Sequence, residues 1–283
     1  MTVERGALAA YLDELEWDTL NLPDGWPSPD ARPARGDTSR AQPKDAGTRP
    51  GQTARPRTPV RPSPGAQSPG PGEEPERTDV YRVEVPSDAD QQRRLELYRA
   101  AKEHALACRA CGLCEKRNKV VFGDGDRGAS LMLVGEGPGA AEDREGLPFV
   151  GPAGELLTKM LAAIEIDREQ AYIANVVKCR PPGNRDPKPE EVAACSGYLE
   201  AQVQIIRPRL ILALGRVAAQ SLLVTTESLG RLRGRWHEYA GVPVWVTYHP
   251  AALLRNASYK RPTWEDLQLV RDRLVELETA ASP

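Results

Sequence analysis

Five cysteines are the residues of this chain whose type and spacing most clearly imply chemistry. Three of them form a C-x2-C-x2-C run at residues 108–114, and the other two, Cys179 and Cys195, form a C-x15-C pair. Grouped thiolates bind zinc or an iron–sulfur centre, and five unrelated thiols are the less favoured interpretation. The economical prediction is one metal site of four cysteines, two from the run near residue 110 plus Cys179 and Cys195.

A glycine-rich turn, GEGPGAAEDREGLPFVG at residues 135–151, is the second stretch that could do chemistry. Its spacing matches the G-x-G-x-x-G/A fingerprint of dinucleotide-binding proteins. However, Pro138 removes a backbone donor from the turn, and Glu136 would face the pyrophosphate. A nucleotide-binding oxidoreductase is therefore disfavoured, and the turn better suits a neutral, planar ligand.

Three further side chains could contact such a ligand. Phe149 lies in an irregular segment, where it could stack on a flat ring or only plug the edge of the domain. Asn175 interrupts an apolar run, and its amide offers a donor and an acceptor that suit a pyrimidine edge, although an asparagine can also cap a loop. His249 precedes Pro250, which favours an extended or turn geometry at the histidine; a structural histidine is the alternative.

The loop after His249 combines apolar and basic residues. Leu253 and Leu254 are followed by Arg255, Lys260 and Arg261. This pattern predicts an apolar wedge flanked by phosphate contacts, as in proteins that kink or open a duplex. The alternative is a short buried turn.

Alternating strands and helices must position these residues. Short, nearly continuous apolar runs are typical of strands buried on both faces, and helical runs separate them, which predicts a parallel sheet with helices on both sides. Ligands of such sheets bind beyond the carboxyl ends of the strands. The predicted strands are 129–135, 172–178, 210–215 and 242–248, and the predicted helices are 88–107, 153–165, 189–206, 216–224 and 263–279.

The N-terminal part of the chain differs in composition. Thirteen of the 26 prolines lie between Pro23 and Pro75, which predicts a disordered linker over residues 22–85 and a folded domain over 86–283. The apolar pattern of residues 1–21 predicts a short amphipathic helix. This helix either docks on a protein partner or has no role. Residues 31–70 hold eight Arg or Lys against two Asp, a net charge of +6, so the linker is either a tether to DNA or only a spacer.

Composition also bears on the protein's location. The net charge of −2 does not indicate a protein that binds nucleic acid through its overall charge. No apolar run in the sequence is long enough to span a membrane. The N-terminus lacks the basic start and apolar core of a secretion signal. We therefore expect a cytoplasmic protein without membrane contact.

The ordered motifs GEGPGAAEDREGLPFVG, NVVKCRPPGNRDPKP and HPAALLRN, together with the C-x2-C and C-x15-C spacings, resemble the family 4 uracil-DNA glycosylases over about residues 95–278. The resemblance implies an α/β fold, a three-layer α/β/α sandwich with a four-stranded parallel sheet of strand order 2-1-3-4. It also implies a 4Fe-4S cluster and a DNA repair enzyme that flips uracil out of DNA and hydrolyses its N-glycosidic bond, leaving an abasic site. A non-catalytic DNA-binding module of the same fold is the alternative, although the filled site positions argue against it.

The resemblance also implies roles for individual residues. Glu136, Gly137 and Glu142 would lie beside the uracil and its sugar, and which carboxylate positions the water is left open. Phe149 would stack on uracil, Asn175 would bind its edge and His249 would lie near its O2. The implied cluster ligands are Cys108, Cys111, Cys179 and Cys195.

Cys114 is the extra cysteine, because Gly112 and Leu113 stand where the family usually has Pro-Leu after its cysteine pair. The expected partner is uracil-containing DNA, with a protein partner for residues 1–20 left open. A related branch of the superfamily traps its product through a histidine in an inserted basic loop. No such insertion is present in this sequence, so we expect an enzyme that turns over. We also expect a monomer.

Overall fold

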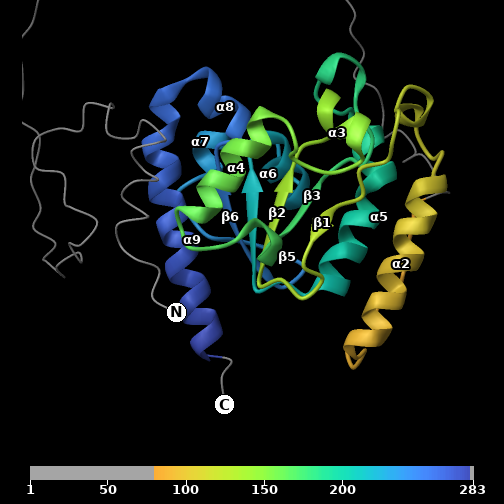
Figure 1. The fold of residues 1–283 in the computed structure, drawn as a ribbon, viewed down its shortest axis with the longest axis horizontal. Helices are drawn as coiled ribbons and strands as arrows, with labels where there is room; N and C mark the ends of the chain where they lie inside the picture. Colours follow the sequence, from red (N-terminus) through yellow and green to blue (C-terminus); the bar gives the residue numbers. More distant parts are fainter. Residues whose placement is uncertain (1–79, 281–283) are drawn as a thin grey trace, which may run out of the picture. The chain divides into compact units, whose positions relative to one another are not determined.

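A six-stranded sheet in the order β1-β3-β2-β4-β6-β5 forms the centre of the protein (Figure 1). The structure is a computed structural model and describes residues 80–280. The predicted helix over 1–21 and the predicted linker up to residue 79 lie outside the described residues. The strands are β1 (Asp124–Gly125), β2 (Leu131–Gly135), β3 (Tyr172–Asn175), β4 (Leu210–Leu214), β5 (His237–Tyr239) and β6 (Val242–Thr247).

The sheet is mixed, which corrects the expected all-parallel sheet of four strands. The inner strands β3, β2, β4 and β6 run parallel in the expected order, but β1 and β5 add antiparallel edges. Both edge strands are short and polar, with sequences DG and HEY. Polar edge strands of two or three residues leave no apolar pattern in the sequence, so the prediction missed them.

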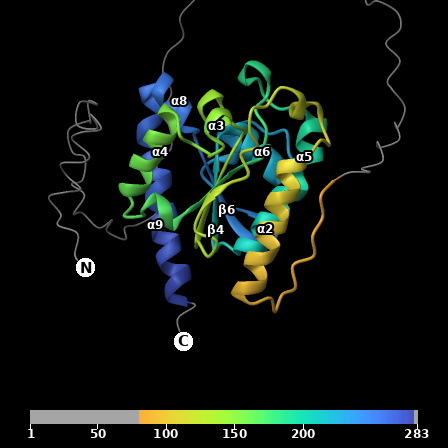
Figure 2. The ribbon, with the colours of Figure 1, turned by 45° about the vertical axis from the view of Figure 1, so that its right-hand side comes forward.

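Helices cover both faces of the sheet. Figure 2 shows α4, α8 and α9 on one face, with α2, α5 and α6 on the other. Several helices begin at a proline, which provides the φ angle of a first turn and lacks the N–H that would be unpaired there. The helices are α2 (Gln91–Ala107), α3 (Ala140–Glu145), α4 (Pro152–Ala162), α5 (Pro189–Ile206), α6 (Arg216–Leu223), α7 (Leu229–Leu232), α8 (Pro250–Arg255) and α9 (Lys260–Ala280).

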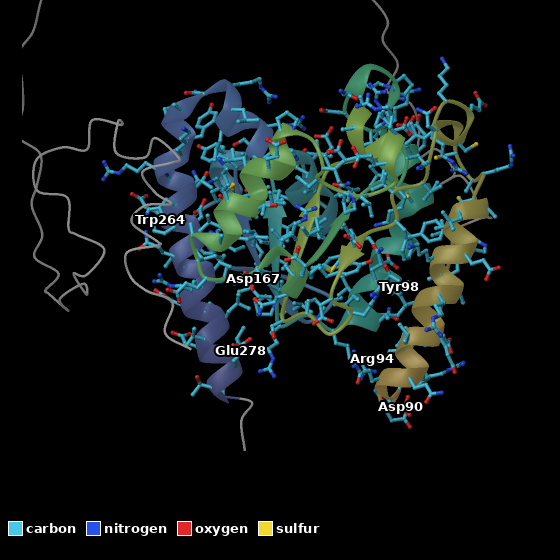
Figure 3. The ribbon with its side chains drawn as sticks, in the orientation of Figure 1. Asp90, Arg94, Tyr98, Asp167, Trp264 and Glu278 are labelled. Carbon is cyan, nitrogen blue, oxygen red and sulfur yellow. The ribbon has the colours of Figure 1, made fainter. Side chains whose placement is uncertain are left out.

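Helix α2 is joined to α5 at its N-terminal end. Asp90 caps α2 by accepting from the Arg93 N–H at 2.7 Å, and Arg94 donates to the Ile205 carbonyl at the end of α5 at 3.0 Å. Asp90 and Arg94 both lie at this end of the helix, with Tyr98 one turn further along (Figure 3). The first helix of the domain is thus held against the helix that carries Cys195.

The folded part of the chain includes residues that the sequence placed in the linker. Tyr81, Val83 and Val85 pack against the core, and the Tyr81 ring stacks on Tyr198 of α5 with centroids 4.9 Å apart.

Between residues 80 and 280, no helix is long and apolar enough to cross a membrane.

Candidate active site

The predicted pocket residues meet at the carboxyl edge of the parallel strands. Gly135 ends β2 and pairs with Asn175 at the end of β3, and His249 follows β6. A side chain at residue 135 would overlap the Asn175 Oδ1 atom and lie 2.6 Å from the Phe149 ring. Phe149 and His249 are themselves stacked, with ring centroids 5.5 Å apart. The structure therefore brings Phe149, Asn175 and His249 together around Gly135.

Asn175 carries an unused hydrogen-bond acceptor. Its side chain is 2 % exposed, and its Oδ1 atom has no hydrogen-bond partner among residues 80–280. A buried polar atom without a partner costs about 1–3 kcal/mol. Such an atom beside an aromatic ring is suited to accept from a planar ligand that brings its own N–H.

Phe149 is held in a backbone conformation that side chains rarely adopt. Its φ angle is 53°, in the left-handed region that costs a bulky residue free energy. The Arg168 guanidinium donates to the carbonyl of the preceding Pro148 at 2.7 Å, and a side chain at Gly154 would overlap the Phe149 carbonyl. The ring is therefore fixed in place by its surroundings.

Glu142 holds the segment that follows Phe149. One carboxylate oxygen accepts from the Val150 and Gly151 N–H groups at 3.0 and 3.1 Å, and the other accepts from the Gly139 N–H at 3.1 Å. Both oxygens of Glu142 are thus used by the backbone of the turn.

Asp143, the next acidic residue of the turn, has a structural role. It is buried and accepts from the Asn118 backbone N–H at 2.9 Å and from the Asn118 side-chain amide at 2.5 Å. This contact connects the pocket turn to the segment that follows the cysteine run.

Glu136 is the carboxylate whose environment is most unusual. Burial raises its pKa to about 7; the nearby Asp186 carboxylate also raises the pKa, and the Arg216 guanidinium lowers it. Asp186 and Arg216 form an ion pair with each other. A carboxyl group with a pKa near neutrality can exchange a proton at physiological pH.

His249 is a neutral imidazole with a defined tautomer. Burial and, to a smaller extent, the Arg255 charge lower its pKa to about 4, while the Glu142 carboxylate acts in the opposite direction. Its Nδ1 atom accepts from the Ala251 N–H at 3.1 Å, so the ring proton lies on Nε2. The backbone and Cβ of His249 approach Gly215 closely, because a side chain there would lie 2.9 Å from the His249 Cβ. His249 is therefore available as an Nε2–H donor.

The two leucines of the basic loop differ in exposure. Leu253 is 1 % exposed and lies in the core, whereas Leu254 is 55 % exposed. Leu254 alone can therefore contact a partner without rearrangement of α8. Arg255 ends this helix, and Lys260 and Arg261 begin α9.

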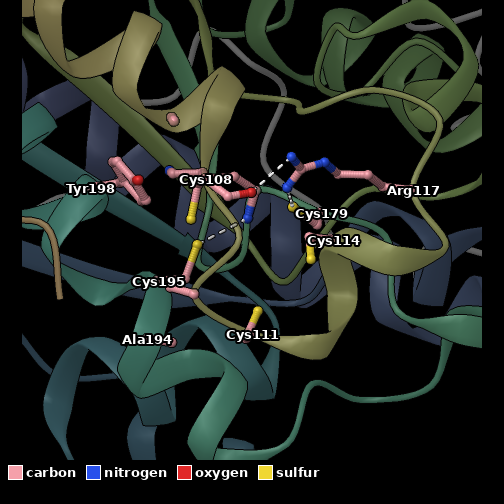
Figure 4. A pocket seen from close by; sticks show the side chains of 11 residues that line it. Cys108, Cys111, Cys114, Arg117, Cys179, Ala194, Cys195 and Tyr198 are labelled. Atoms are coloured by element: carbon pink, nitrogen blue, oxygen red, sulfur yellow. Dashed lines mark hydrogen bonds between the residues drawn. The ribbon is translucent and has the colours of Figure 1, made fainter. Parts of the chain in front are cut away.

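All five cysteines line one cavity on the α2–α5 side of the sheet (Figure 4). Cys108 follows α2, Cys111 and Cys114 lie in or beside the 3-10 helix Gly112–Glu115, Cys179 follows β3 and Cys195 lies in α5. None of them forms a disulfide. The site therefore lies where α2 meets the loop after the second parallel strand.

Hydrogen-bond donors point at the sulfur atoms. Arg117 donates to the Cys179 sulfur at 3.1 Å, and the Lys178 backbone N–H donates to the Cys195 sulfur at 3.3 Å. Burial raises the pKa of Cys195 to about 12 and raises that of Cys179, so a bound metal would have to displace these protons. Within residues 80–280, no three His, Cys, Asp or Glu side chains are close enough together to hold a single metal ion. The thiols surround a space and do not converge on one point.

Comparison with known proteins decides the family. Residues 122–268 match the model of the uracil DNA glycosylase superfamily. The chain belongs to the uracil-DNA glycosylase superfamily. It is 42 % identical to the Type-4 uracil-DNA glycosylase of Sulfurisphaera tokodaii over 180 residues, which cover 60 % of this chain and 82 % of the relative. The Type-4 enzymes of Thermotoga maritima (45 % over 179 residues, 62 % and 93 %) and Archaeoglobus fulgidus (46 % over 173 residues, 58 % and 87 %) are similar to a comparable degree.

Several residues of this glycosylase-family site carry no signal in the sequence. Arg168 supports the Phe149 loop from twenty residues away, and Arg117 reaches Cys179 across 62 residues. Lys178 is fully buried between the pocket and the cysteines, and burial lowers its pKa to about 8. An isolated Lys or Arg is usually solvated, so only the tertiary contacts distinguish these three. Gly215, the last residue of the predicted strand 210–215, is a position that a glycine-based search could have found.

Proposed function

We propose that this protein is a DNA repair glycosylase that removes uracil from DNA by hydrolysing the N-glycosidic bond and leaves an abasic site. The observation that carries the proposal is the unpaired, buried Asn175 Oδ1 beside the Phe149 ring. Membership in the uracil-DNA glycosylase superfamily and the similarity to Type-4 enzymes support it.

The pocket suits a flipped uracil. Phe149 stacks on the ring, the Asn175 Oδ1 accepts from uracil N3–H, and the Asn175 amide N–H donates to O4. Cytosine presents an acceptor at N3 and a donor at C4, so each of these two contacts would be mismatched. Gly137 lets the backbone come close to the base, because a side chain there would lie 2.8 Å from the Val177 side chain.

The chemistry follows from two groups of opposite character. As the bond between C1′ and N1 breaks, its electron pair stays on the base and the sugar becomes cation-like. The neutral His249 donates its Nε2–H to uracil O2, where negative charge develops. The ionised Glu136 stabilises the sugar and accepts a proton from the water whose oxygen bonds to C1′. Glu136 is preferred to Glu142 for this role, since both oxygens of Glu142 already bind backbone N–H groups.

A 4Fe-4S cluster is the metal group that best fits the cysteine site, with Cys108, Cys111, Cys179 and Cys195 as ligands. The shared cavity and the N–H donors directed at two sulfurs support this assignment. When bound, the cluster would cross-link α2, α5 and the loop after β3. Cys114 would remain outside the ligand set.

The loop at α8 would contact the duplex. Leu254 would enter the base stack and stabilise the opening left by the flipped base, while Arg255, Lys260 and Arg261 would lie near phosphates. Leu253 would act only by packing beneath them. The cytoplasmic location and the monomeric state stay predictions.

The N-terminal tether is tested by deleting residues 1–79, because residues from Tyr81 onward already pack on the domain. A tether predicts unchanged base release at saturating enzyme and a shallower dependence of DNA affinity on salt. Equal salt slopes would leave only the spacer.

Single-turnover release of uracil from uracil-containing DNA tests the function. The wild-type protein should release the base, and Asn175→Ala should slow release while the thermal midpoint stays near that of the wild type. Specific binding of such DNA without any base release would contradict the proposal and favour the non-catalytic module.

A further inference from the structure

Lys178 is a buried cation that the proposed reaction does not yet use. Its side chain is 1 % exposed. The ammonium donates to the Asn175 backbone carbonyl at 2.8 Å and to the Gln202 Oε1 atom at 2.6 Å, and it lies 5.9 Å from the centre of the Phe122 ring. Lys178 thus contacts the residue that would bind the uracil edge.

The surrounding network fixes the direction of these bonds. The Gln202 amide nitrogen donates to the Phe122 carbonyl at 2.7 Å and to the Tyr172 hydroxyl at 2.9 Å. The Gln202 oxygen must therefore face Lys178. Both partners of the ammonium are acceptors, as a protonated lysine requires.

Its partners carry no charge. Among the ion pairs of residues 80–280, none includes Lys178, and its two hydrogen-bond acceptors are a carbonyl and an amide. Burying a cation whose hydrogen-bond partners are neutral is costly, and the nearby Cys195 and Cys179 sulfurs offset this cost only when they are ionised. A methionine of similar length would fill the same space without that cost, so packing alone does not explain a lysine.

The position of the ammonium suggests what the charge does. It lies 2.8 Å from the carbonyl oxygen of Asn175, the residue that ends β3 at the carboxyl edge where the base would bind. In a buried site the field of a charge is weakly screened and extends over several ångströms. The base that leaves is an anion, so a fixed positive charge at this place favours bond breaking.

We propose that Lys178 is a positioning residue of base release: it holds the Asn175 carbonyl and places a positive charge next to the residue that binds the departing uracil. The inference rests on the proposed function. The same residue borders the cysteine site, since its backbone N–H donates to the Cys195 sulfur. Lys178 therefore contacts Asn175 of the proposed uracil pocket through its side chain and the cysteine site through its backbone.

Two variants of the full-length protein test the proposal. Lys178→Met removes the charge and the donor, whereas Lys178→Gln removes the charge and retains an N–H donor on a side chain one atom shorter. Tyr172→Phe is the matched control, because it disturbs the same buried network one hydrogen bond further from the ammonium. Iron content and the thermal midpoint of each protein establish that the fold and the cysteine site are retained.

The decisive readout is the ionisation of bound free uracil at N1, measured by ultraviolet absorbance across pH in the presence of abasic-site DNA. With Lys178→Met or Lys178→Gln, bound uracil should ionise at higher pH than with the wild type, and single-turnover release should fall about 10- to 100-fold, somewhat less than for a donor in direct contact. Tyr172→Phe should change neither quantity.

The proposal is overturned if a folded, iron-loaded Lys178→Gln protein releases uracil at the wild-type rate. It is also overturned if that variant is slow while the ionisation of bound uracil is unchanged, or if Tyr172→Phe reproduces both effects. A wild-type protein that released no uracil would instead refute the proposed function, so the two failures are distinguishable.

Discussion

Glu142→Gln tests whether Glu142 positions the attacking water or only supports the segment that holds Phe149. In the structure, one oxygen of Glu142 accepts from Val150 and Gly151, and the other accepts from Gly139. A glutamine can keep the first pair through its oxygen but would direct its amide N–H2 at the Gly139 N–H. The variant therefore loses one hydrogen bond to a charged group, which costs about 1.5–3 kcal/mol of stability.

The effect on base release should act through Phe149. The neutral amide oxygen also accepts more weakly from Val150 and Gly151 than the carboxylate does. This loosens the segment that holds Phe149 at a φ of 53°, so the largest loss of rate equals the loss of stacking. Stacking of a base on an aromatic ring contributes about 1–3 kcal/mol, which corresponds to about a 5- to 150-fold change in rate. A residue that activates water would instead contribute about 10²- to 10⁴-fold.

A double-mutant cycle with Phe149→Ala makes the distinction. Single-turnover uracil release and urea denaturation are measured for the two single variants and the double variant. If Glu142 only supports the loop, Glu142→Gln should add little to the rate loss of Phe149→Ala. Our reasoning is refuted if the double variant is slower than Phe149→Ala by the full factor seen for Glu142→Gln alone, because Glu142 would then act independently of the ring.

Three further predictions concern the acid, the cysteines and the basic loop. Because the pKa of Glu136 is raised to about 7 and its ionised form is required, the single-turnover rate should rise with pH through about 7; Glu136→Gln should be slow and lose this dependence, and a wild-type rate that falls over that range would contradict the assignment. Cys195→Ala should lose iron and thermal stability whereas Cys114→Ala should lose neither, as measured by metal analysis and thermal denaturation; stoichiometric zinc without iron in the wild type would contradict the cluster. Leu254→Ala should slow release from double-stranded DNA more than from single-stranded DNA, and equal losses on both substrates would argue against a wedge.

The alternation of apolar runs and helices was sufficient to predict the inner part of the fold. Runs such as LMLVG and LILAL are buried on both faces, and only a parallel sheet covered by helices buries strands in that way. The edge strands β1 and β5 were missed because their pairing depends on the neighbouring strand and not on their own residues.

The candidate site divides in the same way. The sequence determined which residue types were available. The glycine turn, Asn175 and His249 each lie at or just after the carboxyl end of a strand, and so must meet at one edge of the sheet. Only the tertiary structure decided their states. The pKa values of Glu136 and His249 depend on burial. Leu253 and Leu254 are adjacent in the chain, yet the first is buried and the second is exposed. Lys178 donates to Gln202, which lies 24 residues away in the sequence. Burial and long-range contacts are properties of the packed chain, and no local pattern of residues encodes them.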